Sequence, residues 1–109
     1  MFPKNLSRIV VCEKLVDFRK QWNGLLGEAE RLGFDPYAGD LVVFVKRDRR
    51  QLRAICGDEK GFYLFSRRFE GGVFSFSFTE DGVKTMSRSC VESWFAGTQT
   101  ISKTLRSVR

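Results

Sequence analysis

Histidine is absent from this sequence of 109 residues. The absence removes the usual general base near neutral pH, the commonest transition-metal ligand, and the partner of a serine or cysteine nucleophile. No apolar run approaches the roughly 20 residues that span a bilayer. The initial stretch MFPKNLSRIVV also lacks a signal-peptide core and a cleavage site. We therefore expect a cytoplasmic protein with no membrane partner, and most small-enzyme chemistries are excluded.

Cysteine is also scarce, with Cys12, Cys56 and Cys90 as its three positions. They are widely spaced, and each stands among apolar residues as a small core side chain would. This pattern predicts reduced and buried thiols rather than disulfides.

The acidic residues are dispersed along the chain. An RNase-H-like transposase needs clustered carboxylates that hold two metal ions about 4 Å apart. Here the acids fall in separate turns and on one helix surface: Asp58, Glu59, Glu80, Asp81, Glu28 and Glu30. No phosphate-binding P-loop is present either. The sequence therefore predicts a protein that is not an enzyme and that has no cofactor, no metal site and no catalytic residue.

The composition is that of one folded domain: 42% of the residues are hydrophobic, 29% are charged, and phenylalanine occurs 11 times. Lysine and arginine together number 19 against 13 acidic residues, which gives a net charge of +6. A basic balance of this size favours polyanionic partners without identifying one.

The clearest element is a helix predicted over residues 17–32. Its apolar residues recur at helical spacing: Phe18, Trp22, Leu25, Leu26, Ala29 and Leu32. Asp17 is placed to cap the first turn, and Gly33 is placed to adopt the left-handed conformation beyond the last turn. We expect this stripe, Trp22 included, to pack in the core.

Short apolar runs predict five strands, at residues 8–15, 41–45, 51–56, 62–69 and 73–78. The last four are separated by segments of hairpin length. A second helix is predicted from Ser87 to the residue before Gly97. The predicted fold class is α+β: a strand, a long helix, a four-stranded antiparallel meander and a short C-terminal helix. Residues 1–97 form this single domain, and residues 98–109 form a basic, frayed tail.

The predicted sheet is apolar on both faces. Strand 73–78 alternates phenylalanine with smaller residues, whereas strands 41–45 and 62–69 carry bulky apolar residues on either side. One long helix covers one face only, so the C-terminal helix or a second copy of the chain must cover the other. A homodimer through the sheet, and hence a homo-oligomer, is one expectation.

A basic turn follows the second predicted strand. Its cations are Lys46, Arg47, Arg49, Arg50 and Arg53, and antiparallel pairing of the next two strands would bring Arg67 and Arg68 beside them. Arg19 and Lys20 stand in the first turn of the long helix, where the dipole slightly disfavours cations. Three interpretations are open: contact with nucleic-acid phosphates, solvated charge that protects a sheet edge, and contact with an acidic protein partner. Arg19 and Lys20 are equally well explained by a surface salt bridge.

Four blocks carry a family resemblance: DFRKQWNGL at 17–25, FDPYAGDLVVF at 34–44, the basic turn, and GFYLFSRRFEGGVF at 61–74. In this order and spacing, over residues 14–76, the chain resembles the second-open-reading-frame (TnpB-type) proteins of insertion sequences of the insertion-sequence-66 family. The resemblance implies a mobile-element accessory protein that works beside a separate transposase. Cys56 and Gly57 stand where the family usually has two aromatic residues.

Our first hypothesis is a non-enzymatic accessory protein that binds the DNA backbone or a transposase through the basic turn. The binding surface would comprise Lys46, Arg47, Arg49, Arg50, Arg53, Arg67, Arg68, Arg19 and Lys20. An alternative is a histidine-free ribonuclease of the toxin type, with Tyr63, Arg67 and Arg68 around the scissile phosphate. A third is a plain homodimeric assembly module.

Overall fold

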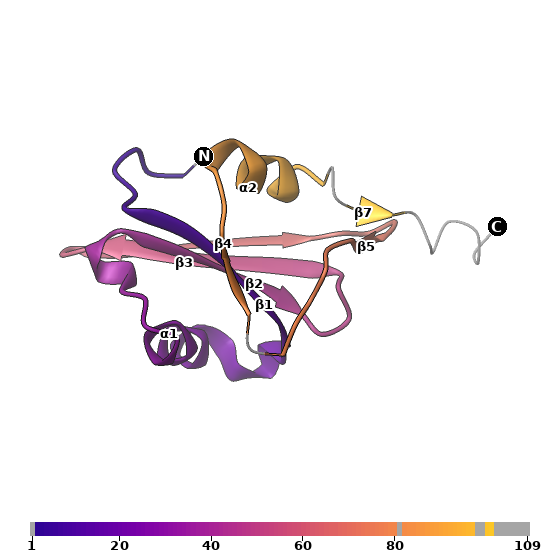
Figure 1. The fold of residues 1–109 in the computed structure, drawn as a ribbon, viewed down its shortest axis with the longest axis horizontal. Coiled ribbons are helices and arrows are strands. Elements are labelled where there is room, and N and C mark those ends of the chain that lie inside the picture. Colours follow the sequence, from indigo (N-terminus) through magenta and orange to yellow (C-terminus); the bar gives the residue numbers. More distant parts are fainter. Residues whose placement is uncertain (1, 81, 98–99, 102–109) are drawn as a thin grey trace.

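The computed structural model of this chain describes residues 2–80, 82–97 and 100–101. A five-stranded sheet lies between two helices, α1 and α2 (Figure 1). Its strands are β1 (Arg8–Val16), β2 (Asp40–Lys46), β3 (Gln51–Asp58), β4 (Gly61–Arg68) and β6 (Val83–Thr85). The helices are α1 (Gln21–Arg31) and α2 (Arg88–Phe95), with 3₁₀ turns η1 (Phe18–Lys20) and η2 (Pro36–Ala38). A small second sheet pairs β5 (Val73–Phe74) with β7 (Thr100–Ile101).

The order of the large sheet is β4-β3-β2-β1-β6. β1 and β2 are parallel, and the chain crosses between them through α1, as a parallel pair requires. β2, β3 and β4 follow one another as antiparallel neighbours. β6 returns from late in the sequence to pair antiparallel with β1, so β1 is an interior strand. The α+β class is therefore confirmed.

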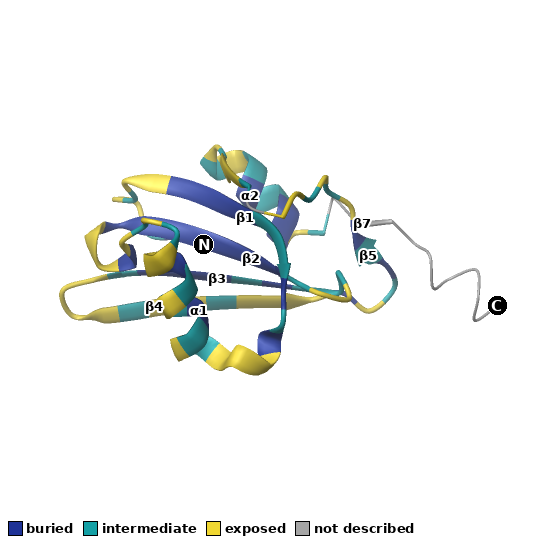
Figure 2. Ribbon diagram, turned by 60° about the horizontal axis from the view of Figure 1, so that its bottom comes forward, coloured by how far each residue is buried: buried dark blue, intermediate teal, exposed yellow. Residues whose placement is uncertain are grey.

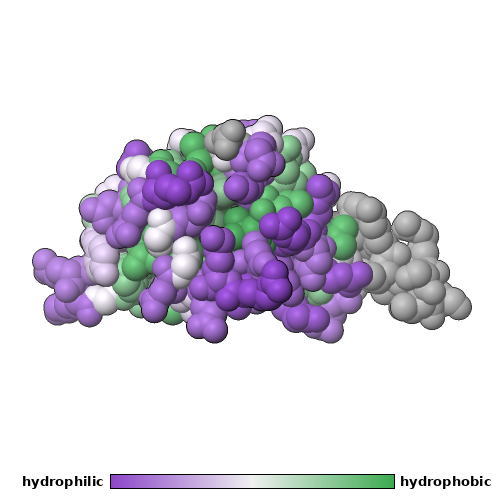
Figure 3. All heavy atoms as spheres, turned by 90° about the horizontal axis from the view of Figure 1, so that it is seen from below, coloured by the Kyte–Doolittle hydropathy of each residue, from purple (hydrophilic) through white to green (hydrophobic). Residues whose placement is uncertain are grey.

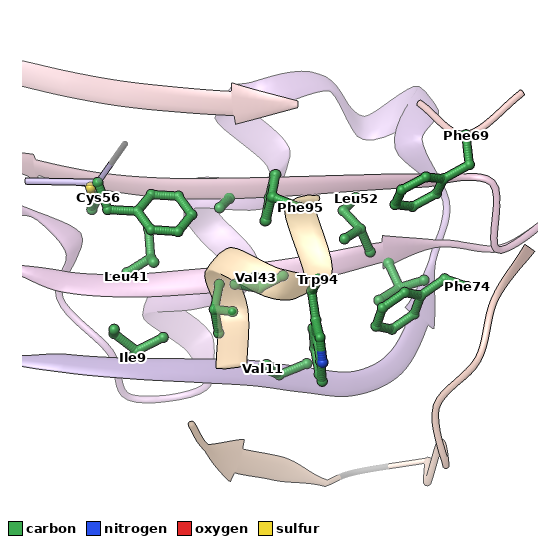
Figure 4. Packing of buried hydrophobic residues seen from close by; sticks show 14 residues of the cluster. Ile9, Val11, Leu41, Val43, Leu52, Cys56, Phe69, Phe74, Trp94 and Phe95 are labelled. Carbon is green, nitrogen blue, oxygen red and sulfur yellow. The ribbon is translucent and has the colours of Figure 1, made fainter. Parts of the chain in front are cut away.

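Side-chain alternation along the strands supplies two cores. On one face, Val42 and Phe44 pack with Leu25 and Ala29 of α1. The opposite face carries a larger cluster under α2, in which Trp94 lies beside Phe74 (Figure 4). The burial colours follow this plan, since β2 is dark blue along most of its length whereas β4 is teal and yellow (Figure 2). The two helices thus cover both faces of the middle of the sheet.

The predicted long helix has a break near its start. Asp17 accepts a hydrogen bond from the backbone N–H of Arg19, as a capping residue does, but it caps the 3₁₀ turn η1. Gln21 then adopts a φ of 61°, and the regular helix α1 begins there. At the other end Gly33 has a φ of 93°, the left-handed conformation that the sequence predicted.

The prediction of a four-stranded meander is wrong for its last strand. Residues 73–78 were predicted to pair with the preceding strand, yet only Val73–Phe74 forms a strand, and its partner is β7. The phenylalanine alternation has another cause: Phe74 and Phe76 lie 4.7 Å and 4.8 Å from Trp94, between ring centroids. The segment therefore follows α2 rather than β4, and the sequence EGG is not a hairpin turn.

The C-terminal helix is confirmed. Ser87 caps it by accepting a hydrogen bond from the backbone N–H of Cys90, and Gly97 adopts a φ of 95° just beyond its end. Of the predicted tail, only Thr100–Ile101 is described, as β7, and the rest lies outside the described residues.

The thiols of Cys12 and Cys56 are buried and that of Cys90 is half-buried, and all three are free. None of the helices in the described residues is long and apolar enough to cross a membrane.

Candidate nucleic-acid interface

The predicted basic turn joins β2 to β3, and Lys46, Arg47, Arg49 and Arg50 are named here the basic hairpin. Asp48 holds its backbone, because its carboxylate accepts a hydrogen bond from the N–H of Arg50 at 2.9 Å. The N–H of Arg49 donates to the carbonyl of Lys46 at 2.8 Å, and Arg49 adopts a φ of 63°. The turn therefore has a defined backbone that fixes the direction of each cation.

The chain that follows β4 braces this turn from outside. The N–H of Phe69 donates to the carbonyl of Arg50 at 2.8 Å, and that of Phe74 donates to the carbonyl of Arg49 at 2.6 Å. On the other side, the N–H of Arg47 donates to the carbonyl of Val16 at 3.0 Å. Since three backbone hydrogen bonds to two separate segments hold the hairpin, substituting its exposed side chains leaves this backbone support in place.

The four cations of the basic hairpin differ in how far they are already paired. Lys46 lies 3.5 Å from the Asp48 carboxylate, and the guanidinium of Arg49 lies over the Phe78 ring at 4.8 Å. Arg47 is exposed and Arg50 is half-buried, and neither has a carboxylate within ion-pair distance among the described residues. Arg47 and Arg50 are thus the two cations most available to an external anion.

Arg53 lies apart from the basic hairpin, under α1. Its guanidinium is 4.6 Å from the Phe18 ring centroid and 5.0 Å from that of Trp22. It donates to the carbonyl of Phe18 at 3.4 Å, and its buried Nε has no hydrogen-bond partner in the described structure. Alternation along β3 sends this side chain to the α1 face, where it supports packing.

The structure does bring Arg67 and Arg68 to the hairpin end of the sheet, opposite Leu52 and Gln51 of β3. The guanidinium of Arg67 is engaged, because it donates to the carbonyl of Phe95 at 3.1 Å. Arg68 is exposed and lies 3.4 Å from the Glu70 carboxylate, also exposed. An exposed pair of this kind contributes little and exchanges readily for another anion.

Arg19 and Lys20 lie on η1, on the side of the molecule that carries α1. Figure 3 shows this side as mostly hydrophilic, interrupted by apolar patches. Hydrogen bonds from the Arg19 side chain, followed by one from its backbone N–H, lower the pKa of Asp17 to about 2. The salt bridge that the sequence offered as one explanation is therefore present for Arg19, with Asp17 as its partner.

A cleft beside the basic hairpin was not predicted. It has a volume of about 460 Å³ and is lined by Lys14, Leu15, Arg47, Phe78, Thr79 and Glu80. The N–H of Thr79 donates to the carbonyl of Glu13 at 3.0 Å, which holds together the two chain segments that contribute Lys14, Leu15, Thr79 and Glu80 to the lining. Lys14 lies 3.8 Å from the Glu80 carboxylate, so this cleft adds one weakly paired cation to the surface.

Among the described residues, no group of three or more histidine, cysteine, aspartate or glutamate side chains could hold a metal ion. Burial raises the pKa of the Cys56 thiol to about 11 and also raises that of Cys12, so neither is an activated nucleophile. The residues proposed for a ribonuclease are not convergent either. Phe65 stacks on Tyr63 at 6.3 Å and stands between it and Arg67, which points to α2.

Gly57, one of the two positions where the resemblance implies an aromatic residue, has little room for a side chain. A Cβ atom on Gly57 would lie 2.6 Å from the carbonyl oxygen of Gly61 and 2.8 Å from the Phe62 ring. Phe62 therefore occupies the space beside position 57, and its ring packs against Tyr37 at 4.5 Å. A larger side chain at position 57 would therefore require Phe62 or the Gly61 backbone to move.

Taken together, these residues form a small α+β domain with a basic hairpin at one end of its sheet and, in the part described, no metal-binding cluster. Its sequence is similar to "Uncharacterized protein y4jC" of Sinorhizobium fredii (strain NBRC 101917 / NGR234). The two are 38% identical over 86 residues, which cover 78% of this chain and 74% of the relative. No solved structure matches it.

The chain belongs to the IS66 Orf2 like protein family, whose model matches residues 7–104. This confirms the family that the sequence resembles, and the match extends beyond residues 14–76 at both ends. Membership associates the chain with transposition, as an accessory protein of an insertion sequence, and the family is not known for an enzymatic activity.

Proposed function

We propose that this accessory protein acts without catalysis and contacts the backbone of duplex DNA through the basic hairpin. The observation that carries the proposal is the pair Arg47 and Arg50, which project from a braced turn without an ion-pair partner among the described residues. The half-buried Lys46 and the exposed Arg68 lie beside them in weak ion pairs that phosphates can replace. Cations presented in this way bind phosphates and read no base sequence.

The test is a titration of duplex DNA with the full chain at several salt concentrations. Replacing Arg47 and Arg50 together with alanine should weaken binding at least tenfold at low salt. It should also reduce the slope of log affinity against log salt by about 1.8, since each phosphate contact contributes about 0.9. Arg49 is left unchanged, because its left-handed φ and its contact with Phe78 belong to the turn.

A matched control removes the same charge elsewhere. Lys4 and Lys60 are both exposed, and they lie at the end of the sheet opposite the basic hairpin. The Lys4→Ala/Lys60→Ala variant should bind DNA nearly as tightly as the unaltered chain. Equal losses in the two variants would mean that only net charge matters, and unchanged binding by Arg47→Ala/Arg50→Ala would refute the proposal.

The same cations also suit an acidic surface on a transposase. This second candidate rests on the neighbouring cleft, which is lined by both an acid and a cation: Glu80 lies 3.8 Å from Lys14. Charged groups of either sign on a protein partner could therefore pair with a residue of the cleft. A chain that fails to bind DNA but captures the element's transposase, and loses it on Arg47→Ala/Arg50→Ala, would favour this candidate.

A further inference from the structure

The outer side of β4 is an open sheet edge. β4 pairs with β3 through eight consecutive residues without a bulge, and no described strand pairs with its other side. An open edge presents a row of unpaired backbone N–H and C=O groups to any strand that approaches. Proteins usually protect such edges by shortening them, or by placing proline, a bulge or a charge on them.

The two edges of this sheet are protected to different degrees. β6, at the opposite edge, has three residues, and its central one is Lys84. β4 has eight residues, and its first six, from Gly61 to Ser66, include no charge and no proline. Only one edge therefore carries the usual protection against strand addition.

The side chains of β4 add apolar surface to this edge on both faces. Tyr63 is 49% exposed and Leu64 is 46% exposed, whereas the equivalent positions of β2 are fully buried. Phe62 and Phe65 are half-buried and contact Tyr37 and Phe2 from the two sides. A neighbouring strand would bury these side chains together with the backbone edge.

Charge selects the partner and its direction. The turn that leads into β4 carries the acids Asp58, the last residue of β3, and Glu59, and β4 ends with the cations Arg67 and Arg68. A parallel copy would set like charges together, whereas an antiparallel copy brings the acidic end of each strand to the basic end of the other. The edge is therefore complementary to itself, as a two-fold interface requires.

We infer that β4 pairs antiparallel with β4 of a second copy of this chain, which joins the two sheets into one. In an antiparallel ladder, a residue whose N–H and C=O groups point to the shared edge lies opposite another residue of that kind. The two-fold axis of the dimer must therefore pass between one residue and the same residue of the second copy. With Tyr63 at the axis, residues 61–65 of the two strands pair, and Arg67 and Arg68 of each strand extend beside the turn of the other copy that carries Asp58 and Glu59. With Leu64 at the axis, Arg68 would instead come next to Lys60 of that turn, so the charges favour Tyr63.

The first test is disulfide trapping at the axis. In a background that replaces Cys90 with serine, Tyr63→Cys should give a covalent dimer under mild oxidation, because directly opposed residues have Cβ atoms about 5 Å apart. Ser66→Cys is the matched control: its side chain is also exposed on β4, and its own copy lies six residues along the ladder, roughly 20 Å away. Equal yields of covalent dimer from both variants would contradict this register, because they would show that the disulfides form by random collision.

The second test measures assembly of the unaltered full chain by sedimentation at concentrations up to about 100 μM, where dimers of moderate affinity are populated. Leu64→Lys should weaken the dimer at least tenfold, and Val83→Lys, at the exposed opposite edge, should leave it unchanged. A monomer throughout, or a dimer lost only with Val83→Lys, would overturn the inference. Both readouts are independent of DNA, so they stand or fall separately from the proposed function.

Discussion

The ion pair between Arg8 and Asp40 is predicted to be the most important charged contact for the stability of this domain. Asp40 is 3% exposed, and it opposes Arg8 in the first pairing of β1 with β2. Its carboxylate accepts hydrogen bonds from Arg8 at 3.1 Å and 2.7 Å and from the N–H of Asp35 at 2.8 Å. These three bonds tie β1, β2 and the turn before β2 at one point.

The perturbation is Arg8→Ala, which leaves the buried carboxylate of Asp40 with one hydrogen bond from the described residues, that of the Asp35 N–H. Breaking a fully buried pair costs about 3 to 5 kcal/mol, and the Arg8 side chain is 52% exposed, so water can replace part of it. We expect a loss of about 2 kcal/mol at neutral pH, or roughly 10 °C in Tm for a domain of this size. Asp40→Asn and the double variant complete a cycle that isolates the coupling of the two side chains.

The pH dependence gives an independent check. Hydrogen bonds from Arg8 hold the pKa of Asp40 below its ordinary value, against the opposing effect of burial. A carboxyl group whose pKa is lower in the folded state stabilises above its unfolded pKa of about 3.9 and loses that contribution as the pH falls through the folded value. The difference between Arg8→Ala and the unaltered chain in urea unfolding should therefore shrink as the pH falls below about 4. A difference under about 0.5 kcal/mol at neutral pH would refute the reasoning.

Two further predictions concern the α2 side of the sheet. Trp94→Ala should lower the free energy of unfolding by about 3 to 5 kcal/mol, because a buried indole that contacts Phe74 and Phe76 is lost. Trp94→Phe should cost much less, since it also removes an indole N–H that has no hydrogen-bond partner among the described residues. Urea unfolding of both variants, followed by circular dichroism, checks the order, and equal costs would contradict it. A thiol reagent at mildly alkaline pH should label the half-buried Cys90 before Cys56, because burial raises the pKa of the Cys56 thiol to about 11. Peptide mass spectrometry measures the order of labelling, and faster modification of Cys56 would show that its burial is transient.

Local signals in the sequence were reliable for the elements that local chemistry determines. The cap at Asp17 and the left-handed Gly33 were both predicted, although the cap belongs to a 3₁₀ turn. The start of α2 at Ser87 followed from the same kind of capping chemistry. In each case the interacting groups lie within a few residues of one another, so the sequence window contains all the information needed.

Non-local pairing was harder to predict. The alternation Phe74, Phe76, Phe78 suits a strand as well as a segment that lies along a helix, because both direct every second side chain to one side. The rings of Phe74 and Phe76 in fact contact Trp94, a residue near the end of the described chain. The three-residue strand β6 was missed, since Val83–Thr85 offers too short a pattern to recognise.

For the candidate surface, the sequence predicted where Arg67 and Arg68 lie, but it did not predict the contacts that each cation makes. Strand pairing placed Arg67 and Arg68 near the basic hairpin correctly. That Arg53 lies against Phe18 and Trp22, however, depends on how α1 packs on the sheet. The cleft lined by Lys14 and Glu80 likewise depends on a chain crossing that only the folded structure determines.

The position of Phe2 has a consequence for the order in which the chain is synthesised and folded. Its ring meets Phe65 at 4.7 Å and Phe95 at 5.5 Å, and its carbonyl accepts a hydrogen bond from Arg88 at 3.0 Å. Phe2 is therefore synthesised well before two of its partners, Arg88 and Phe95, which lie late in the described chain. The α2 side of the core cannot close on the ribosome until Phe95 has emerged, so a nascent chain that stalls earlier exposes the apolar face of its sheet.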